Sequence, residues 1–262
     1  MIVFESTSYY NFLRMAFILK LYLIWGVSIF ALGLILLYPF FAIIIWSSNE
    51  KLLKSTYYFN RLWARFTYFM IFVPVTRIRK AKLNTKASYV FVSNHSSFLD
   101  IPAIQLIVNQ FVVFLGKRSL ATAPLFGWMF RNLHICVDRG NPEKTEEMFR
   151  KCLNKLNQGF SIGVFPEGTQ NRTPPTLNKF KDGAFIIAIR SQKPVVPITI
   201  VTNWKIWPAL APRLSWSPLI LVQHEPISTE GMTLNDVATL RDQVKEVIES
   251  ELKLRYPKEY NL

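Results

Sequence analysis

One histidine of this chain lies near a carboxylate that would make it a base. His95 is followed five residues later by Asp100, and both come just after the apolar run Tyr89 to Val92. A neutral imidazole that a carboxylate holds in one tautomer can take a proton from a hydroxyl at neutral pH. Of the three histidines, His95 alone has a carboxylate at this spacing. The pair therefore predicts a general base that acts on an alcohol.

A structural interpretation of the same segment is also open. Asn94, Ser96 or Ser97 could cap a helix expected from Phe98 to Gln110, because short polar side chains accept hydrogen bonds from the first free amides of a helix. The two interpretations are compatible, since α/β proteins bind ligands where a strand ends and a helix begins.

A second polar block follows another expected strand and reads Phe165-Pro166-Glu167-Gly168-Thr169. Pro166 and Gly168 predict a tight turn, which leaves Glu167 and Thr169 in a loop where both can face a ligand. Such turns are also common without any function. In a parallel sheet the carboxyl ends of the strands meet at one edge, so we expect this loop and His95 to share one site.

Cations also follow several of the expected strands, and a cluster of this kind suits a phosphate ligand. Each cation taken singly is typical of an ordinary protein surface. Lys117 and Arg118 follow one strand, Arg139 follows another, and Lys179 and Lys181 come after the Pro174-Pro175 loop.

Charge and hydropathy together indicate a membrane surface. The 262 residues carry a net charge of +14 and are 50% apolar, which excludes a disordered chain and favours a polyanionic partner. Leu21 to Trp46 has no charged side chain, and a helix of that length spans about 39 Å against a hydrocarbon core of about 30 Å. Between Glu50 and Lys86 nine Lys or Arg accompany one Glu, the bias of a cytoplasmic face. No nucleic-acid module accompanies the charge, so nucleic acid is not an expected partner.

Two features of the N-terminal region refine the expected membrane segment. Tyr38-Pro39 interrupts the apolar run, so we expect the helix to kink or end there and the following residues to continue or re-enter the membrane. The next stretch, Tyr57 to Phe72, carries Arg61 and Arg65 among aromatic side chains, which predicts a helix at the membrane interface. Whether the first segment spans the bilayer or forms a re-entrant hairpin stays open at this point.

Short apolar runs alternate with longer amphipathic ones beyond this region. The alternation predicts an α/β fold: a layered domain with a largely parallel sheet flanked by helices over residues 76–262, preceded by a membrane anchor and interfacial helix over residues 1–75. The expected strands are Tyr89 to Val92, Phe111 to Leu115, Ile135 to Val137, Ser161 to Phe165, Val195 to Val201 and Leu219 to Gln223. The expected helices are Phe98 to Gln110, Ser119 to Arg131, Pro142 to Gln158, Gly183 to Gln192 and Leu234 to Arg255, the last with Thr233 and Asp236 as a capping pair.

The cysteines do not predict a metal centre. Cys136 and Cys152 lack the spacing of metal ligands and have no nearby histidine cluster, so we expect reduced thiols in a cytosolic compartment and no metal.

Four blocks in order resemble the glycerolipid acyltransferase family, whose members include 1-acylglycerol-3-phosphate acyltransferase. The resemblance covers about residues 89 to 200 and extends in overall length and N-terminal hydrophobicity to bacterial members. The blocks are Asn94-His95 with Asp100, Lys117-x-x-Leu120-x-x-x-Pro124-x-x-Gly127, Phe165-Pro166-Glu167-Gly168-Thr169, and Val196-Pro197-Ile198.

This resemblance implies transfer of an acyl group from acyl-CoA or acyl carrier protein to the free hydroxyl of a lysophospholipid, at the cytoplasmic face of a bacterial inner membrane, with no covalent enzyme intermediate and no cofactor. His95 would be the base and Asp100 its orienting partner. Backbone amides near Gly168 are our expected donors to the oxyanion. The resemblance and the loop pattern imply that substrate contacts come from Asn94, Lys117, Arg139, Glu167, Gly168, Thr169 and Arg172.

The chain departs from the family pattern at one position. Gln170 stands where the third block usually continues with an arginine that the family associates with phosphate binding. Arg172 is two residues away and is one expected substitute. The alternative is a different acceptor, such as a zwitterionic lysolipid or an amino-acid lipid.

Two rival classes remain from the sequence. A serine or thiol hydrolase would need a nucleophile, but no Gly-x-Ser-x-Gly pattern is present. A non-catalytic membrane adaptor would leave His95, Asp100 and Glu167 without a chemical purpose.

Overall fold

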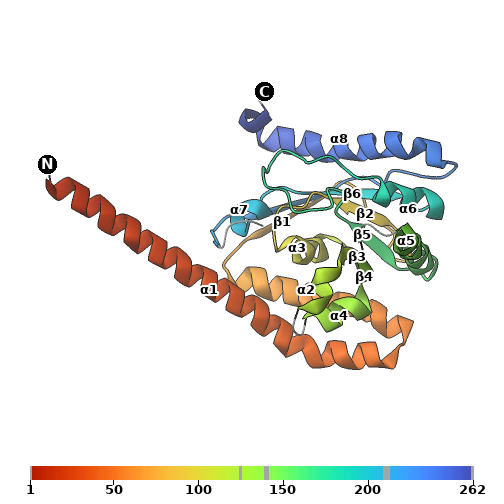
Figure 1. The fold of residues 1–262 in the computed structure, drawn as a ribbon, viewed down its shortest axis with the longest axis horizontal. Helices are drawn as coiled ribbons and strands as arrows, with labels where there is room; N and C mark the ends of the chain where they lie inside the picture. Colours follow the sequence, from red (N-terminus) through yellow and green to blue (C-terminus); the bar gives the residue numbers. More distant parts are fainter. Residues whose placement is uncertain (1, 124–125, 139–141, 209–212, 261–262) are drawn as a thin grey trace.

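The computed structural model describes residues 2–123, 126–138, 142–208 and 213–260. Two helices, α1 (Ile2–Ser47) and α2 (Glu50–Met70), precede a sheet with helices on both faces (Figure 1). The strands are β1 (Val75–Arg79), β2 (Val90–Ser93), β3 (Val112–Lys117), β4 (Ile135–Val137), β5 (Ser161–Val164), β6 (Val195–Ile200) and β7 (Leu219–Gln223). The remaining α-helices of the described residues are α3 (Asp100–Ile107), α4 (Phe126–Leu133), α5 (Pro142–Asn157), α6 (Gly183–Ser191), α7 (Asn203–Ile206) and α8 (Val237–Arg255).

The sheet is largely parallel, as the sequence predicts. Its order in the described residues is β1-β7-β6-β2-β5-β3-β4. Strands β6, β2, β5, β3 and β4 are parallel, whereas β7 is antiparallel to β6 and carries β1 parallel to itself at the edge. All six predicted strands are present within a few residues of their expected bounds. Strand β1 was not predicted, because its sequence Val-Thr-Arg-Ile-Arg has two exposed arginines and no buried residue.

Side chains on the two faces of the sheet pack into different clusters. In β2, Val90 and Val92 join the cluster that contains Phe185 of α6, whereas Phe91 joins the one that contains Ile104 of α3. All four β2 residues are buried, as expected of a strand covered by helices on both sides. Strand β2 is therefore a rigid central support for the residues that follow it.

The helix expected from Ser119 to Arg131 is interrupted. A 3-10 turn (Arg118–Thr122) precedes α4, and Ala123 between them has an extended backbone with ψ 135°. Proline restricts the residue before it to this extended region, and Pro124 follows Ala123 in the sequence. The predicted Thr233 and Asp236 capping box is confirmed, at the 3-10 turn (Leu234–Asp236) before α8.

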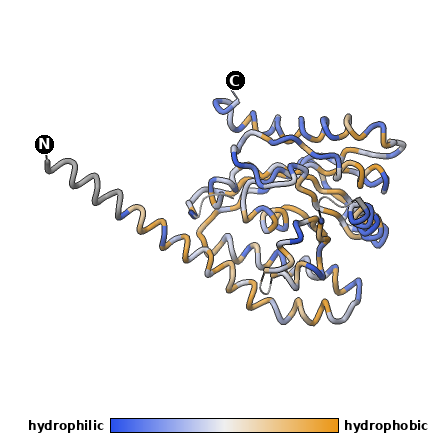
Figure 2. The backbone as a smooth tube through the Cα atoms, viewed as in Figure 1, coloured by the Kyte–Doolittle hydropathy of each residue, from blue (hydrophilic) through white to orange (hydrophobic). Residues whose placement is uncertain are grey.

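Helix α1 continues through Pro39 to Ser47 rather than ending there, and Figure 1 shows it changing direction where it passes beneath the domain. Much of the α1 tube is orange, hydrophobic, in Figure 2. Among the described residues, the segment Arg14–Ser47 of this helix is the one candidate that is long and apolar enough to cross a membrane.

The same helix also contributes to the protein core. Phe41 of α1 and Tyr68 of α2 are fully buried, and the Trp63 indole donates to the Phe30 carbonyl at 3.0 Å. Gly33 makes this contact possible, since a Cβ there would lie 2.7 Å from the Trp63 ring. The domain boundary expected at residue 75 stays a prediction. Buried side chains of α1 and α2 pack in the same hydrophobic clusters as side chains of the α/β domain.

Candidate active site

His95 and Asp100 meet at the carboxyl edge of the parallel strands. His95 lies two residues beyond β2, and Asp100 is the first residue of α3. The imidazole Nδ1 lies 2.8 Å from Asp100 Oδ2; the Asp100 side chain is 0% exposed and the His95 side chain is 21% exposed. A carboxylate only accepts hydrogen bonds, so this contact places the proton on Nδ1 and the lone pair on Nε2. The partly exposed imidazole is therefore arranged as a base.

Four donors converge on the Asp100 carboxylate. Besides His95, the backbone amides of Ser96 and Ser97 donate to Oδ2 at 2.7 and 2.8 Å, and Asn203 Nδ2 donates to Oδ1 at 2.7 Å. These hydrogen bonds replace the lost hydration of a carboxylate that has no solvent contact. They also fix both oxygens, so Asp100 holds the imidazole at one angle.

The helix-cap interpretation is wrong, because the N-cap residue of α3 is Leu99 and no side chain caps it. The Ser97 hydroxyl accepts from the Leu99 amide at 3.1 Å, in the turn that precedes α3. Asn94 does something else: its side-chain amide donates to the Ile200 carbonyl at 2.9 Å and accepts from the Ile200 amide at 2.8 Å. Asn94 thus joins the end of β2 to the end of β6.

Two residues that sequence analysis missed extend this network. The Tyr68 hydroxyl lies 3.0 Å from Asn203 Oδ1 and 3.1 Å from the Leu99 carbonyl, and Tyr68, Asn203 and Asp100 are fully buried. Burial, together with the negative charge of Asp100, raises the pKa of Tyr68 well above its ordinary value, so the hydroxyl keeps its proton. A chain of hydrogen bonds therefore runs from α2 through Asn203 to the carboxylate that orients His95.

The loop after β5 holds His95 from the other side. Glu167 Oε1 accepts from the His95 amide at 2.8 Å, and the Asn171 amide donates to the His95 carbonyl at 2.7 Å. The Phe165 ring stacks on the imidazole with centroids 4.2 Å apart. The expectation that this loop and His95 share one site is met, because β2 and β5 are parallel neighbours.

The Glu167 side chain is buried at this contact and does not lie on the protein surface. Its second oxygen accepts from the Asn178 amide at 3.1 Å, and the residue is 4% exposed. Burial raises the pKa of Glu167 to about 7, although the amides of His95 and Asn178 oppose the shift. Both carboxylate oxygens are thus engaged by the protein backbone.

The raised pKa of Glu167 predicts a pH-dependent stability. Between the ordinary value of 4.5 and about 7 the folded protein binds more protons than the unfolded one, so the free energy of unfolding falls as pH rises across that range. In Glu167→Gln this contribution is absent, and the stability difference between the two proteins is expected to change by up to about 3 kcal/mol between those pH values. Thermal unfolding in detergent at a series of pH values measures it. Parallel pH profiles for the two proteins would contradict the assignment.

Gly168 has a structural requirement of its own. Its φ is +73°, a region that favours glycine, and its amide donates to the Phe165 carbonyl at 3.0 Å. That amide is therefore engaged in the turn, and the expectation that amides near Gly168 donate to an oxyanion stays a prediction. The neighbouring Thr169 is exposed.

The predicted cations differ in whether they form ion pairs within the protein. Lys117 ends β3 beside β5 and is exposed, as is Arg172. Arg118 forms an ion pair with Asp138 at 2.9 Å, and Asp138 also accepts from Lys144. Arg139 lies outside the described residues.

Of the other two histidines, His224 is buried and His134 is half-buried beside core aromatic rings. His134 Nδ1 accepts from the Phe114 amide at 3.2 Å, and burial lowers its pKa to about 3. His224 contacts Thr199, and burial lowers its pKa to about 4. Among the described residues no group of three or more His, Cys, Asp and Glu side chains could hold a metal ion.

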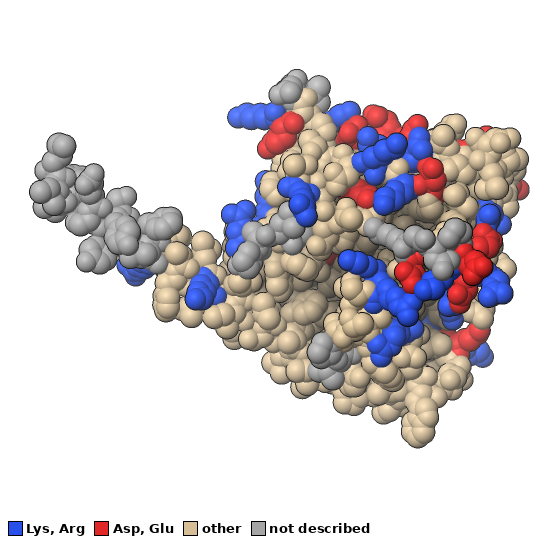
Figure 3. Space-filling view, viewed as in Figure 1, with Lys and Arg blue, Asp and Glu red and all other residues tan. Residues whose placement is uncertain are grey.

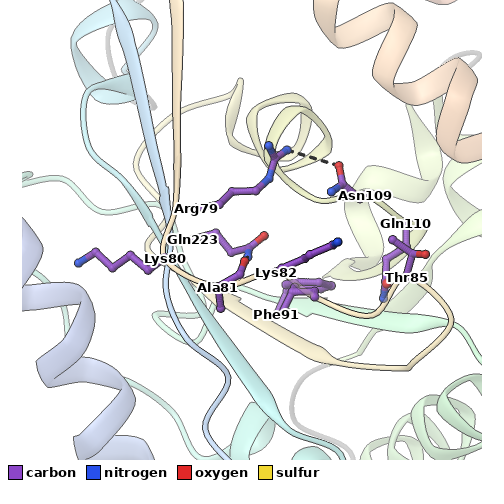
Figure 4. Close-up of a pocket in the computed structure, with 10 residues that line it drawn as sticks. Arg79, Lys80, Ala81, Lys82, Thr85, Phe91, Asn109, Gln110 and Gln223 are labelled. Atoms are coloured by element: carbon purple, nitrogen blue, oxygen red, sulfur yellow. Dashed lines mark hydrogen bonds between the residues drawn. The ribbon is translucent and has the colours of Figure 1, made fainter.

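A basic pocket of about 320 Å³ lies at the opposite edge of the sheet (Figure 4). Its Arg79 guanidinium donates to the Ile107 carbonyl at 2.7 Å and to Asn109 at 3.4 Å, which satisfies the C-terminus of α3. Gln110, which also lines it, precedes β3, so the pocket lies beyond the amino ends of the parallel strands. It is separate from the His95 site.

A family model and the sequences of individual relatives indicate the same family for this chain. Residues 65–201, more than half of the chain, match the family model described as Acyltransferase. The chain is 30% identical over 176 residues to the chloroplastic 1-acyl-sn-glycerol-3-phosphate acyltransferase BAT2 of Brassica napus, covering 66% of this chain and 51% of that protein. It is 32% identical over 160 residues to 1-acyl-sn-glycerol-3-phosphate acyltransferase alpha of Homo sapiens, covering 60% and 56%. The chain thus spans about half the length of these relatives.

The fold also has a counterpart among solved structures. The crystal structure of the 1-acyl-sn-glycerophosphate acyltransferase PlsC from Thermotoga maritima superposes with a TM-score of 0.73 at 23% sequence identity. The superposition covers 90% of this chain and 94% of that one. The N-terminal helices and the α/β domain therefore belong to one shared architecture.

Proposed function

The chain belongs to the acyltransferase family, and on that premise we propose that it moves an acyl group from acyl-CoA or acyl carrier protein to the free hydroxyl of a lysophospholipid. We propose 1-acylglycerol-3-phosphate as the acceptor and phospholipid synthesis as the purpose, because the two relatives described above carry that acceptor in their names.

The observation that carries the proposal is the 2.8 Å contact between Asp100 and the partly exposed imidazole of His95. Free alkoxide is too unstable to form at neutral pH, so Nε2 takes the hydroxyl proton as the oxygen attacks the thioester carbonyl. The carbonyl carbon gains the new ester bond and the thiol leaves with a proton. Asp100 stabilises the imidazolium that exists between these two transfers.

The remaining residues divide into positioning and contact roles. Asn94, Glu167 and Gly168 support the backbone around His95, because their polar groups already bond within the protein. Substrate contacts are left to exposed groups near the same edge: Lys117, Thr169 and Arg172, with Arg139 as a further proposed contact.

An acceptor panel tests this proposal. Membranes containing the protein are incubated with labelled acyl-CoA or acyl carrier protein and with lysolipids that differ only in head group. Conversion of 1-acylglycerol-3-phosphate to its diacyl form supports the proposal. Preference for a zwitterionic or amino-acid lysolipid would support the alternative that Gln170 raises, and no conversion of any lysolipid would support a non-catalytic adaptor.

The N-terminal helix α1 bears on where in the cell this reaction takes place. We propose that α1 anchors the protein, with the domain on the cytoplasmic side of a bacterial inner membrane, because basic residues follow the apolar segment. Figure 3 shows the lower part of one face, where α1 and α2 lie in Figure 1, largely without charged side chains. The acyl chain and the lysolipid would then reach the site from the bilayer.

Charges placed on the exposed face of α1 test the anchor. Ile24 and Ile35 are 54% and 52% exposed, so substitution there leaves the packed side of the helix intact. A charge near the centre of a membrane helix costs about 2.5 to 3.5 kcal/mol. The double variant Ile24→Asp with Ile35→Asp is therefore expected to leave alkali-washed membranes, whereas Ile24→Ala with Ile35→Ala stays bound. Retention of both variants would contradict the anchor.

A further inference from the structure

A lysine side chain lies across the turn that holds His95. A Cβ at Gly168 would be 3.0 Å from Cε, 3.1 Å from Cδ and 3.1 Å from Nζ of Lys181, so the outer half of the lysine covers the glycine. The Lys181 amide also donates to the Pro166 carbonyl at 2.9 Å. Lys181 is therefore attached to this turn through its backbone and packed on it through its side chain.

The position of this ammonium group follows from the turn beneath it. Gly168 comes directly after Glu167, whose carboxylate accepts from the His95 amide at 2.8 Å. Any side chain at residue 168 would occupy the space that Lys181 fills. The missing Cβ at Gly168 thus leaves room for a cation beside the loop that contacts His95.

Carboxylates near Lys181 are engaged with other residues. Asp182 pairs with Arg241 at 2.8 Å, and Glu167 accepts two backbone amides. None of the ion pairs found among the described residues includes Lys181, which is exposed. Gln170, two residues after Gly168, is neutral. Lys181 is therefore a cation packed on this turn that forms no ion pair within the described part of the chain.

We propose that Lys181 binds the phosphate of the acceptor and so selects a phosphate-bearing lysolipid. This inference rests on the proposed function. In 1-acylglycerol-3-phosphate, two carbons and one ester oxygen separate the reacting hydroxyl from the phosphorus. With the hydroxyl at His95 Nε2, the phosphate must lie close to the loop that contacts His95, and an ammonium group is a strong donor to it.

Steady-state kinetics in detergent micelles at fixed lipid fraction test this assignment. Lys181→Met is expected to raise the KM for 1-acylglycerol-3-phosphate about tenfold, because the variant loses one charge-assisted hydrogen bond to the phosphate. The same substitution is expected to change kcat less than about twofold. Lys181→Arg is expected to restore most of the affinity. The matched control is Lys193→Met, since Lys193 precedes β6 at the opposite edge of the sheet and is expected to match wild type.

The outcomes separate this inference from the proposed function. Wild-type protein that acylates no lysolipid would overturn the proposed function itself. Active wild type with an unchanged KM in Lys181→Met would overturn only the role of Lys181. A rise in the KM for acyl-CoA instead of the acceptor would mean that the lysine binds a donor phosphate, and an equal effect of Lys179→Met would mean a general field of surface charge. Either result also overturns the assignment.

Discussion

Replacing His95 by alanine is expected to lower kcat for acyl transfer by about 10³-fold or more, since general base catalysis contributes about 10² to 10⁴ and the substitution also removes the oriented acceptor contact. The fold should survive, because His95 is partly exposed and its backbone contacts to Glu167 and Asn171 do not need the ring. Initial rates and thermal unfolding of the same preparation measure both effects.

A second variant at this position separates chemistry from structure. Asparagine in His95→Asn retains a donor that can face Asp100 but has no base, so its rate is expected to be as low as that of His95→Ala. If His95 served only to support the entry of α3, the asparagine would restore activity. Near wild-type turnover in either variant would contradict the role of base.

Substituting Asp100 by asparagine is expected to cause the second large loss, about 10³-fold in kcat, by analogy with the loss of orientation in other histidine and carboxylate pairs. The new side-chain NH₂ would face donors that now converge on Asp100. An imidazole that turns its Nδ1 lone pair to this NH₂ carries its proton on Nε2, where it blocks the base.

The same substitution should also affect stability. The amides of Ser96 and Ser97 donate to one buried oxygen, and unsatisfied buried donors cost about 1 to 3 kcal/mol. We expect a lower unfolding temperature for Asp100→Asn, together with a kcat that stays low when the protein is measured well below that temperature. Full activity under those conditions would show that Asp100 stabilises the fold without orienting the base.

Much of the candidate site could be predicted from the sequence because parallel strands share an edge. His95 follows β2 and Glu167 follows the neighbouring β5, so spacing and strand pattern were enough to bring them together. The role of Glu167 was harder to predict. Its partners are backbone amides of His95 and Asn178, and every residue except proline has one, so no pattern of side chains marks them.

The network behind Asp100 had no sequence signal. Asn203 lies 103 residues from Asp100 in the chain, and Tyr68 belongs to a helix that resembles an interfacial one in composition. In the sequence, an asparagine that donates to a buried carboxylate cannot be distinguished from an ordinary loop asparagine, because only the fold brings the two residues together. The packing of α1 against the domain could not be predicted for a similar reason, because an apolar side chain suits both lipid and the protein interior.

Rapid-quench analysis with a labelled acyl donor tests the central claim, direct transfer promoted by His95, most directly. Wild-type protein is mixed with the donor, with and without 1-acylglycerol-3-phosphate, and the label is followed in lipid, free fatty acid and protein. We predict label in the diacyl product only when acceptor is present, with none bound covalently to the protein, and no product in His95→Ala. Acyl-labelled protein, or free fatty acid released without acceptor, would contradict direct transfer and indicate a nucleophilic hydrolase instead.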